Sequence, residues 1–315
     1  MSSLVRADQG AALERPEPRP GAERGSGRAK GIFFALFSAS AFSTLGLFAR
    51  LIYSAGFSVP QALAWRFTAA SLVLWAIVLV TKRPSAGRKL LPVILLGLFG
   101  FAPQAGLYFL TVSILDPGIT SLLLYLYPSF VILLSIVFLR KRPNSIQLVS
   151  LALSLLGCAI TFFHPGTYPI VGLCLGAIMA VVYGAYLVVG ERVLEGVDPI
   201  RATALIMTGA ACIYWAVSVA TGPIRLPTQA HAIEGILGSG VISSVFAVAA
   251  LFAAMRRIGA ADTSLLSTLE PVLTVILSGI FLAERLGTAQ AVGGLLILAA
   301  VIVLRFEPRP QGGPA

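Results

Sequence analysis

From Gly31 onward the chain repeats one pattern, an apolar stretch long enough to cross a bilayer followed by a short polar break. A spanning α-helix needs roughly 20 consecutive apolar residues, whereas a membrane β-strand alternates polar and apolar residues over about ten positions. None of these stretches alternates. The sequence therefore predicts an all-α polytopic membrane protein with ten transmembrane helices. The predicted spans are 31–53, 60–81, 90–113, 117–139, 145–163, 169–190, 200–221, 233–255, 262–283 and 287–305.

Composition supports a membrane location and excludes an ordinary water-soluble enzyme. Of the 315 residues, 57% are hydrophobic and 11% are charged, whereas soluble domains have roughly 45–50% and about 25%. The segment 1–30 differs, because it is rich in Pro, Gly, Arg and Glu and has too little apolar content to fold. We predict a disordered cytoplasmic tail over 1–30 and a short cytoplasmic C-terminal tail over 307–315.

The positive charge predicts an orientation. Membrane proteins concentrate Lys and Arg in cytoplasmic loops. With the N-terminus inside, the cytoplasmic segments hold 19 of the 23 Lys and Arg residues, and the outer loops hold only Arg225 and Arg285. Both termini are therefore predicted to be cytoplasmic. The net charge of +10 reflects this topology, so we expect a lipid bilayer and no nucleic acid as a partner.

The chain contains an internal duplication. A shift of 143 residues aligns 120–163 with 263–306 without a gap, and 16 of the 44 aligned positions are identical. Apolar composition alone would align many leucines, but it would not align Thr-Ser pairs, prolines and glutamines in register. The aligned pairs include Thr120 with Thr263, Ser121 with Ser264, Pro128 with Pro271, Phe138 with Phe281, Arg142 with Arg285 and Gln147 with Gln290, and upstream Gly97 with Gly240 and Phe109 with Phe252.

Each half holds five predicted helices, so the second half must enter the membrane in the opposite direction. The charges agree, because the connector 140–142 carries three positive residues on the predicted cytoplasmic side. Its external counterpart, 283–285, carries no net charge. This five-plus-five inverted repeat is typical of secondary transporters, in which the substrate site lies near the bilayer midplane between the repeats.

Several short motifs resemble a known family. The segment 263–271, TSLLSTLEP, followed by FLAERL at 281–286, resembles the second repeat of the EamA-type family of the drug/metabolite transporter superfamily. LLYLYP at 123–128 resembles the first repeat, and AWRF at 64–67 resembles the arginine position of the family. The connector 140–142 departs from the Gly-Glu-Arg-like turn of many members, which affects a loop and not the cavity.

The resemblance covers about 31–306 and implies a first repeat over 31–164, a second repeat over 165–306 and a central cavity. It also implies movement of small metabolites, often outward, across the bacterial inner membrane. Amino acids are the leading cargo by this resemblance alone.

Glu270 is the only acidic residue well inside a predicted span, near mid-depth of the ninth. A carboxylate at that depth is costly, so we expect it to face protein or water. It can bind substrate or couple protons, or it can be a structural carboxylate beside Pro271. The aligned residue is Tyr127, before Pro128, which can hydrogen-bond substrate or Glu270, or only pack. Both prolines are predicted to interrupt their helices beside the cavity.

Arg66, in the second span, is a further candidate. It can bind an anionic substrate group, extend to the outer headgroups, or pair with a carboxylate. Small polar residues near mid-span either line the cavity or let helices pack closely. Aromatic residues either line it or belong to interfacial belts. The polar candidates are Ser40, Thr44, Gln104, Ser243 and Ser244, and the aromatic ones are Trp65 and Tyr183, with Tyr108, Tyr125 and Tyr186 as further aromatics.

These observations predict a secondary transporter that works by alternating access on a small-molecule substrate, with protons as a candidate coupling ion. An uncoupled facilitator or exchanger is one alternative, and a receptor-like or intramembrane catalytic protein is another. Only His164 and His231 are present, both in predicted outer loops, and no GxxxxGK[ST] motif occurs. We therefore expect no enzymatic activity, no cofactor and no metal, and the oligomeric state stays open.

Overall fold

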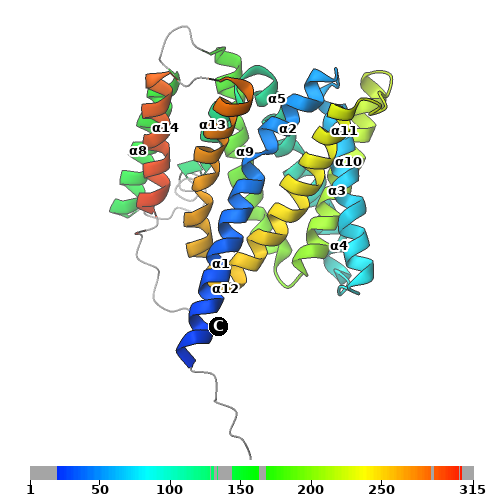
Figure 1. Ribbon diagram of the computed structural model, residues 1–315, viewed down its shortest axis with the longest axis horizontal. Coiled ribbons are helices and arrows are strands. Elements are labelled where there is room, and N and C mark those ends of the chain that lie inside the picture. The colour runs from blue at the N-terminus through cyan, green and yellow to red at the C-terminus, as the bar shows by residue number, and fades with distance from the viewer. Residues whose placement is uncertain are drawn as a thin grey trace, which may run out of the picture.

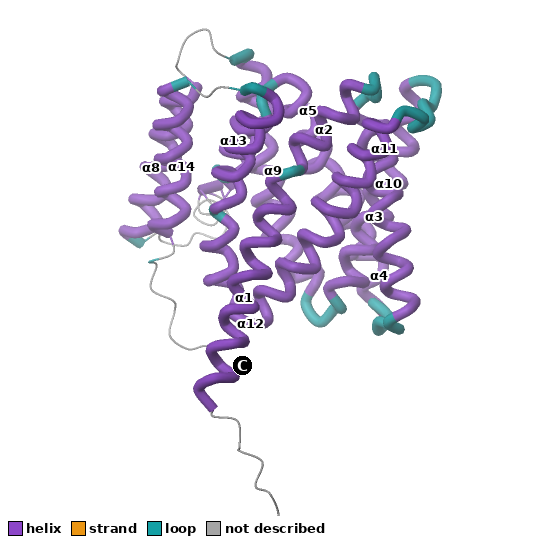
Figure 2. The backbone as a smooth tube through the Cα atoms, in the orientation of Figure 1, coloured by secondary structure: helices purple, strands orange, loops and turns teal. Residues whose placement is uncertain are grey.

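The computed structural model describes residues 20–127, 129–130, 133, 144–162, 168–284, 287–304 and 306. Every regular element in this part of the chain is helical (Figures 1 and 2). The elements of the first half are α1 (Pro20–Ser43), α2 (Leu45–Ser54), α3 (Val59–Val80), the 3₁₀ turn η1 (Gly87–Lys89), α4 (Leu90–Leu96), the π-helical segment η2 (Gly97–Phe101), α5 (Ala102–Ile114), α6 (Pro117–Leu124) and α8 (Ser145–Phe162).

The second half has a similar series of elements. It also contains one π-helical segment, which is longer than the segment in the first half. The elements are α9 (Ile170–Leu194), α10 (Pro199–Thr221), α11 (Ala230–Leu237), the π-helical segment η3 (Gly238–Phe246), α12 (Ala247–Ser267), α13 (Leu269–Leu282) and α14 (Thr288–Leu304).

In the described part of the chain, six helices are long and apolar enough to cross a membrane. They match the predicted spans one, two, three, six, seven and eight. Three shorter apolar helices match spans five, nine and ten. The fourth span is described mainly by α6, because most of its second part lies outside the described residues. The count of ten spans stays a prediction.

Two boundaries differ from those expected. The helix α1 begins at Pro20, inside the predicted disordered tail, since proline is favoured in the first turn and the residues after it include good helix formers. The predicted connection 256–261 lies within α12. Two arginines interrupt the apolar pattern there, but Arg and Ala favour helix and no proline is present. The predictions made for 1–19, Pro128, 140–142, His164, Arg285 and 307–315 concern residues outside the described part of the chain.

The two halves pack against each other in a twofold pattern. The second span contacts the seventh (α3 on α10), the fifth contacts the tenth (α8 on α14), and the fourth contacts the ninth (α6 on α13). The first contacts the eighth (α1 on α12, α2 on α11), while the third contacts the sixth (α5 on α9). Exchanging the halves exchanges these last two contacts, so the pattern is unchanged.

The π-helical segments sit at equivalent places in the two halves. Gly97, in η2, and Gly240, in η3, are aligned by the shift of 143 residues. A Cβ at Gly97 would lie 2.6 Å from the carbonyl oxygen of Ile206, on α10. A Cβ at Gly240 would lie 2.8 Å from the carbonyl oxygen of Arg66, on α3. Both glycines therefore let an irregular helix touch the backbone of a neighbour from the other half.

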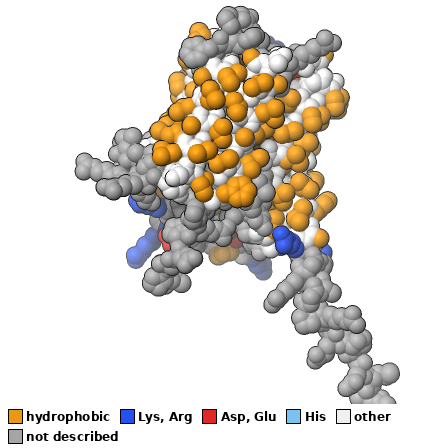
Figure 3. All heavy atoms as spheres, turned by 90° about the vertical axis from the view of Figure 1, so that its left-hand side faces the viewer, with side chains coloured by type: hydrophobic (Ala, Val, Ile, Leu, Met, Phe, Trp, Pro, Cys, Tyr) orange, Lys and Arg blue, Asp and Glu red, His pale blue; other side chains and the backbone are white. Residues whose placement is uncertain are grey.

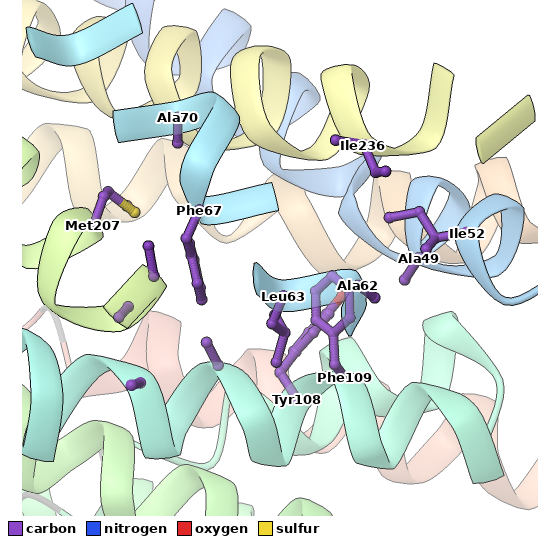
Figure 4. Packing of buried hydrophobic residues seen from close by; sticks show 14 of the residues in the cluster. Ala49, Ile52, Ala62, Leu63, Phe67, Ala70, Tyr108, Phe109, Met207 and Ile236 are labelled. Atoms are coloured by element: carbon purple, nitrogen blue, oxygen red, sulfur yellow. The ribbon is translucent and has the colours of Figure 1, made fainter. Parts of the chain in front are cut away.

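The interior and the surface have the character expected of a membrane protein. In the main buried cluster, Phe67 projects from α3, and Tyr108 and Phe109 of α5 lie against Leu63 of α3 (Figure 4). The outer face over α8 and α14 is covered with hydrophobic side chains, and Lys and Arg gather below it (Figure 3). The exposed side chains on these two helices include Leu148, Leu155, Leu156, Val292, Leu295 and Ile302.

Candidate functional site

Two helix breaks define the candidate site. The helix α6 ends at Leu124 and α12 ends at Ser267, and these two residues are aligned by the internal duplication. Tyr127 follows the first break, and Glu270 lies in the first turn of α13 after the second. A carboxylate is favourable there, because the N-terminal end of a helix carries a partial positive charge. At 1.5 Å per residue, Glu270 is about 18 Å below the other end of α13, within the apolar span.

Tyr125 joins the two breaks. Its hydroxyl lies 2.5 Å from the carbonyl oxygen of Ser267 and 3.1 Å from Oε2 of Glu270, so it can donate a hydrogen bond to either acceptor. A contact with Glu270 was one of the alternatives left open for Tyr127, and among the described residues it is Tyr125 whose hydroxyl reaches the carboxylate. Pro271 is buried in the first turn of α13, while Pro128 lies outside the described residues.

A row of tyrosine rings runs from the breaks into the bundle. The ring of Tyr127 lies 6.2 Å from that of Tyr125 and 4.9 Å from that of Tyr183, on α9. Tyr183 stacks on Tyr186 at 6.1 Å, and Tyr186 lies 5.8 Å from Phe101, in η2. Tyr127, Tyr183, Tyr186 and Glu270 are each only half-buried.

Arg66 is buried at the other end of the aromatic row. Its Nε and Nη2 atoms donate hydrogen bonds of 3.3 and 3.1 Å to the Ser244 hydroxyl. Its guanidinium lies 4.9 Å from the ring centre of Phe67 and 5.1 Å from that of Phe109. Among the described residues no carboxylate forms an ion pair with Arg66. Cation–π contact and the Ser244 hydroxyl stabilise its charge in place of a carboxylate.

The remaining polar candidates divide into two groups. Thr44, at the break between α1 and α2, lies 3.0 Å from the Ser243 hydroxyl, so these two residues link the first and eighth spans. Gln104 is buried on α5, four residues before Tyr108, and no hydrogen bond of its side chain is seen within the described chain. Ser40 donates to the carbonyl of Leu36 and is exposed.

Trp65 lies away from the site. Its indole nitrogen donates a 3.1 Å hydrogen bond to the carbonyl of Arg225, in the connection between α10 and α11, and its ring meets Trp215 edge to face. Adjacent helix positions point about 100° apart, so Trp65 cannot share the direction of Arg66. The sequence analysis did not identify Phe67 and Phe109, whose rings contact Arg66, or Phe101, which extends the tyrosine row. The only sequence feature that indicates any of them is the position of Phe67 directly after Arg66.

A second polar cluster lies at the upper end of Figure 1, where both halves meet. Nη2 of Arg50, on α2, is 3.0 Å from the carbonyl oxygen of Leu115, 3.5 Å from the carboxylate of Asp116 and 3.8 Å from that of Glu284. The Tyr168 hydroxyl donates to Asp116 at 3.1 Å. Burial, and then repulsion from Asp116, raise the pKa of Glu284 to about 7, although Arg50 opposes this shift.

Asp116 and Glu284 also line a cavity of about 300 Å³ beside α13. In the described part of the chain, no group of three or more His, Cys, Asp or Glu side chains is arranged to hold a metal ion. The chemistry of the central site is therefore that of one carboxylate, one buried guanidinium and the aromatic rings between them.

Comparison with known proteins agrees with this arrangement. The family model described as the EamA-like transporter family matches residues 29–163 and again 170–306. An uncharacterized transporter of Archaeoglobus fulgidus is 27% identical over 82% of this chain and 93% of its own length. The uncharacterized transporter YcbK of Bacillus subtilis is 26% identical over 84% and 89%. One crystal structure matches with a TM-score of 0.65 at 20% identity, covering 89% of this chain and 99% of that chain.

The two matches of the family model coincide with the two halves found in the sequence, and the junction between them, 164–169, precedes α9. The solved structure supports the fold alone. With apolar helices long enough to cross a bilayer, this chain is a multi-span membrane protein that belongs to the EamA-like transporter family.

Proposed function

We propose that this protein is a secondary transporter that moves a small metabolite across the bacterial inner membrane by alternating access. The observation that carries the proposal is the pair of helix breaks at equivalent positions, with Glu270 and Tyr127 beside them. Broken helices at the interface of two repeats are the usual place for a transporter substrate site. Ten spans in an inverted repeat, with both termini cytoplasmic, would place this site between two halves that can rock against each other.

The proposed direction is outward and the first cargo to test is an amino acid, both by family resemblance. The purified full-length chain is reconstituted into liposomes preloaded with a radiolabelled amino-acid mixture, and efflux is followed with and without a pH gradient. We expect efflux above that of empty liposomes, with each compound leaving unchanged. Absence of efflux for every compound, or chemical conversion of a compound, would overturn the proposal.

The role of Glu270 in coupling is tested by Glu270→Gln in the same liposomes. We expect this variant to lose the response to the pH gradient, because the amide cannot take up a proton. The control is Glu234→Gln, which changes an exposed glutamate on α11. If Glu270→Gln responds to the gradient as the wild type does, Glu270 does not couple protons to transport.

A further inference from the structure

The central site has a distinctive composition. Glu270 is a half-buried carboxylate deep in an apolar span, and within the described chain no Lys or Arg lies within ion-pair distance of it. Its observed polar contact from another helix is the Tyr125 hydroxyl, a neutral donor. A carboxylate in such surroundings is costly unless it is paired. The charge of Glu270 is therefore available for a partner that the chain itself does not supply.

The aromatic rings beside Glu270 can bind a positive charge. Aromatic faces are negative, and they attract a cation within about 6 Å of the ring centre. The rings of Tyr127 and Tyr183 meet edge to face at 75°, so they present two differently oriented surfaces at one place. Tyr186 extends this surface by stacking on Tyr183 at 15°. All three rings are half-buried, so part of each ring is accessible.

The positive charge of the chain is kept away from these rings. Arg66 is 4% exposed, and the rings within cation–π distance of its guanidinium are Phe67 and Phe109, not the tyrosines beside Glu270. Ser244 fixes the guanidinium by accepting two of its hydrogen bonds. Between the two ends lies an aromatic row whose far end carries the unpaired carboxylate. The surroundings of Glu270 are thus negative in character.

On the basis of the transport function proposed above, we propose that this site binds an organic cation, an amine or quaternary ammonium group. Its charge lies between the rings of Tyr127 and Tyr183 and the carboxylate of Glu270. A free anion would be repelled by Glu270, and a neutral metabolite would leave the carboxylate without a partner. An amino acid could place its ammonium group here, but its carboxylate would need a second donor.

The direct test compares two ligands that differ only in charge. Choline and its neutral isostere, in which carbon replaces the quaternary nitrogen, are titrated into the purified full-length wild type in detergent, and binding is followed by intrinsic tyrosine and tryptophan fluorescence. We expect choline to bind at least about tenfold more tightly, since a desolvated cation–π contact alone contributes about 2 kcal/mol. Equal affinity for the two ligands, or preference for the isostere, overturns the inference.

Variants then locate the site. Tyr183→Phe keeps the ring and should keep choline affinity, whereas Tyr183→Leu and Glu270→Gln should each weaken it. Glu234→Gln and Tyr214→Phe, which change residues outside the tyrosine row, serve as matched controls. Weakening by the controls, or full affinity in both Tyr183→Leu and Glu270→Gln, contradicts the proposed location. The ligand comparison uses only wild-type protein, so it holds even if a variant fails to fold.

The outcomes separate this inference from the transport function. Efflux of uncharged or anionic metabolites, together with equal binding of choline and its isostere, would overturn the cation site and leave transport standing. Discrimination between the two ligands without efflux of any compound would support the cation site and overturn transport.

Discussion

The two repeats share a backbone but differ in their chemistry. Both interrupt a helix at aligned positions, Leu124 and Ser267, and both carry a π-helical segment around an aligned glycine. After the break, however, the first repeat places Tyr127 where the second places Glu270. In the π-helical segments, Phe101 of the first aligns with Ser244 of the second, the hydroxyl that holds Arg66. At these two aligned positions the first half thus supplies rings, and the second half supplies the carboxylate and the hydroxyl.

This difference suggests how a duplicated scaffold becomes a specific site. The helix breaks and the close approach of irregular helices depend on backbone, so both copies need them. The ligand-facing positions depend on side chains, so one copy can change without disturbing the fold. The following predictions test whether backbone features are equivalent in the two repeats while side-chain positions differ, from the largest expected effect to the smallest.

The largest effect is expected at the aligned pair Tyr127 and Glu270. Glu270→Gln should reduce transport at least about tenfold, because hydrogen bonds to charged groups contribute roughly 1.5–3 kcal/mol. Tyr127→Phe keeps the ring and should reduce it about twofold or less, within the range of an exposed polar substitution. Initial rates in proteoliposomes, at matched protein density, measure both. Equal losses in the two variants would show that the halves are functionally equivalent.

The aligned glycines should behave alike. Gly97→Ala and Gly240→Ala each place a Cβ within 3 Å of a carbonyl oxygen on the facing helix, so a backbone must move. We expect each to lower the free energy of unfolding by about 1–3 kcal/mol, the usual cost of overpacking. Thermal unfolding in detergent measures this, with Gly279→Ala as the control, because a Cβ there meets its nearest neighbour at 3.6 Å. If only one of these two variants melted at the wild-type temperature, the two glycines would not have equivalent roles.

Ser244 and Phe101 are aligned but should differ. Ser244→Ala leaves the Nε and Nη2 atoms of buried Arg66 without their acceptor, at a cost of about 1–3 kcal/mol. Phe101→Leu, which removes a ring without leaving a polar atom unpaired, should cost less than about 1.5 kcal/mol. The same unfolding measurement applies to both. A smaller loss for Ser244→Ala than for Phe101→Leu would mean that the hydroxyl does not stabilise the guanidinium.

The smallest effect is the pH dependence of stability that Glu284 contributes in the cluster around Arg50. The pKa of Glu284 is raised from 4.5 to about 7, mainly by burial. Between these values the folded state binds more protons at Glu284 than the unfolded state, so this group makes stability fall as pH rises through the window. Glu284→Gln should flatten that slope in melting temperatures measured between these two pH values. An unchanged slope, with Glu234→Gln as the reference, would show that the carboxylate ionises normally.

Hydropathy and the internal alignment predict most of the scaffold. The apolar runs match the long helices, and the prolines aligned at 128 and 271 indicate the region where α6 and α12 end. Residue type also finds Glu270 and Arg66, because ionisable groups are rare in spans. The spans were predictable because they depend on local composition, whereas Glu270 and Arg66 stay predicted site residues.

The partners of those residues were not predictable in the same way. That Tyr125, rather than Tyr127, reaches Glu270 depends on how the chain turns between α6 and the next residues. The placement of Arg66 between Phe67 and Phe109 depends on how α3 packs against α5. Trp65 was a candidate for the cavity or for an interfacial belt, and in the structure it lies against a connection between helices. Hydrophobic patterning does not specify the rotation of one helix against another, so such contacts need the folded structure.

The cluster around Arg50 has a mechanical consequence. One guanidinium, on the first half, is shared by Asp116 from the same half and Glu284 from the other. The rocking of the two halves proposed above would separate Arg50 from Glu284, so this ion pair would oppose the movement. If both termini are cytoplasmic, as proposed, the cluster around Arg50 faces the outside of the cell, where the external solution would reach it. Its salt weakens the ion pairs by screening, and its acid neutralises Glu284. The medium outside the cell would then set how often the protein opens toward it.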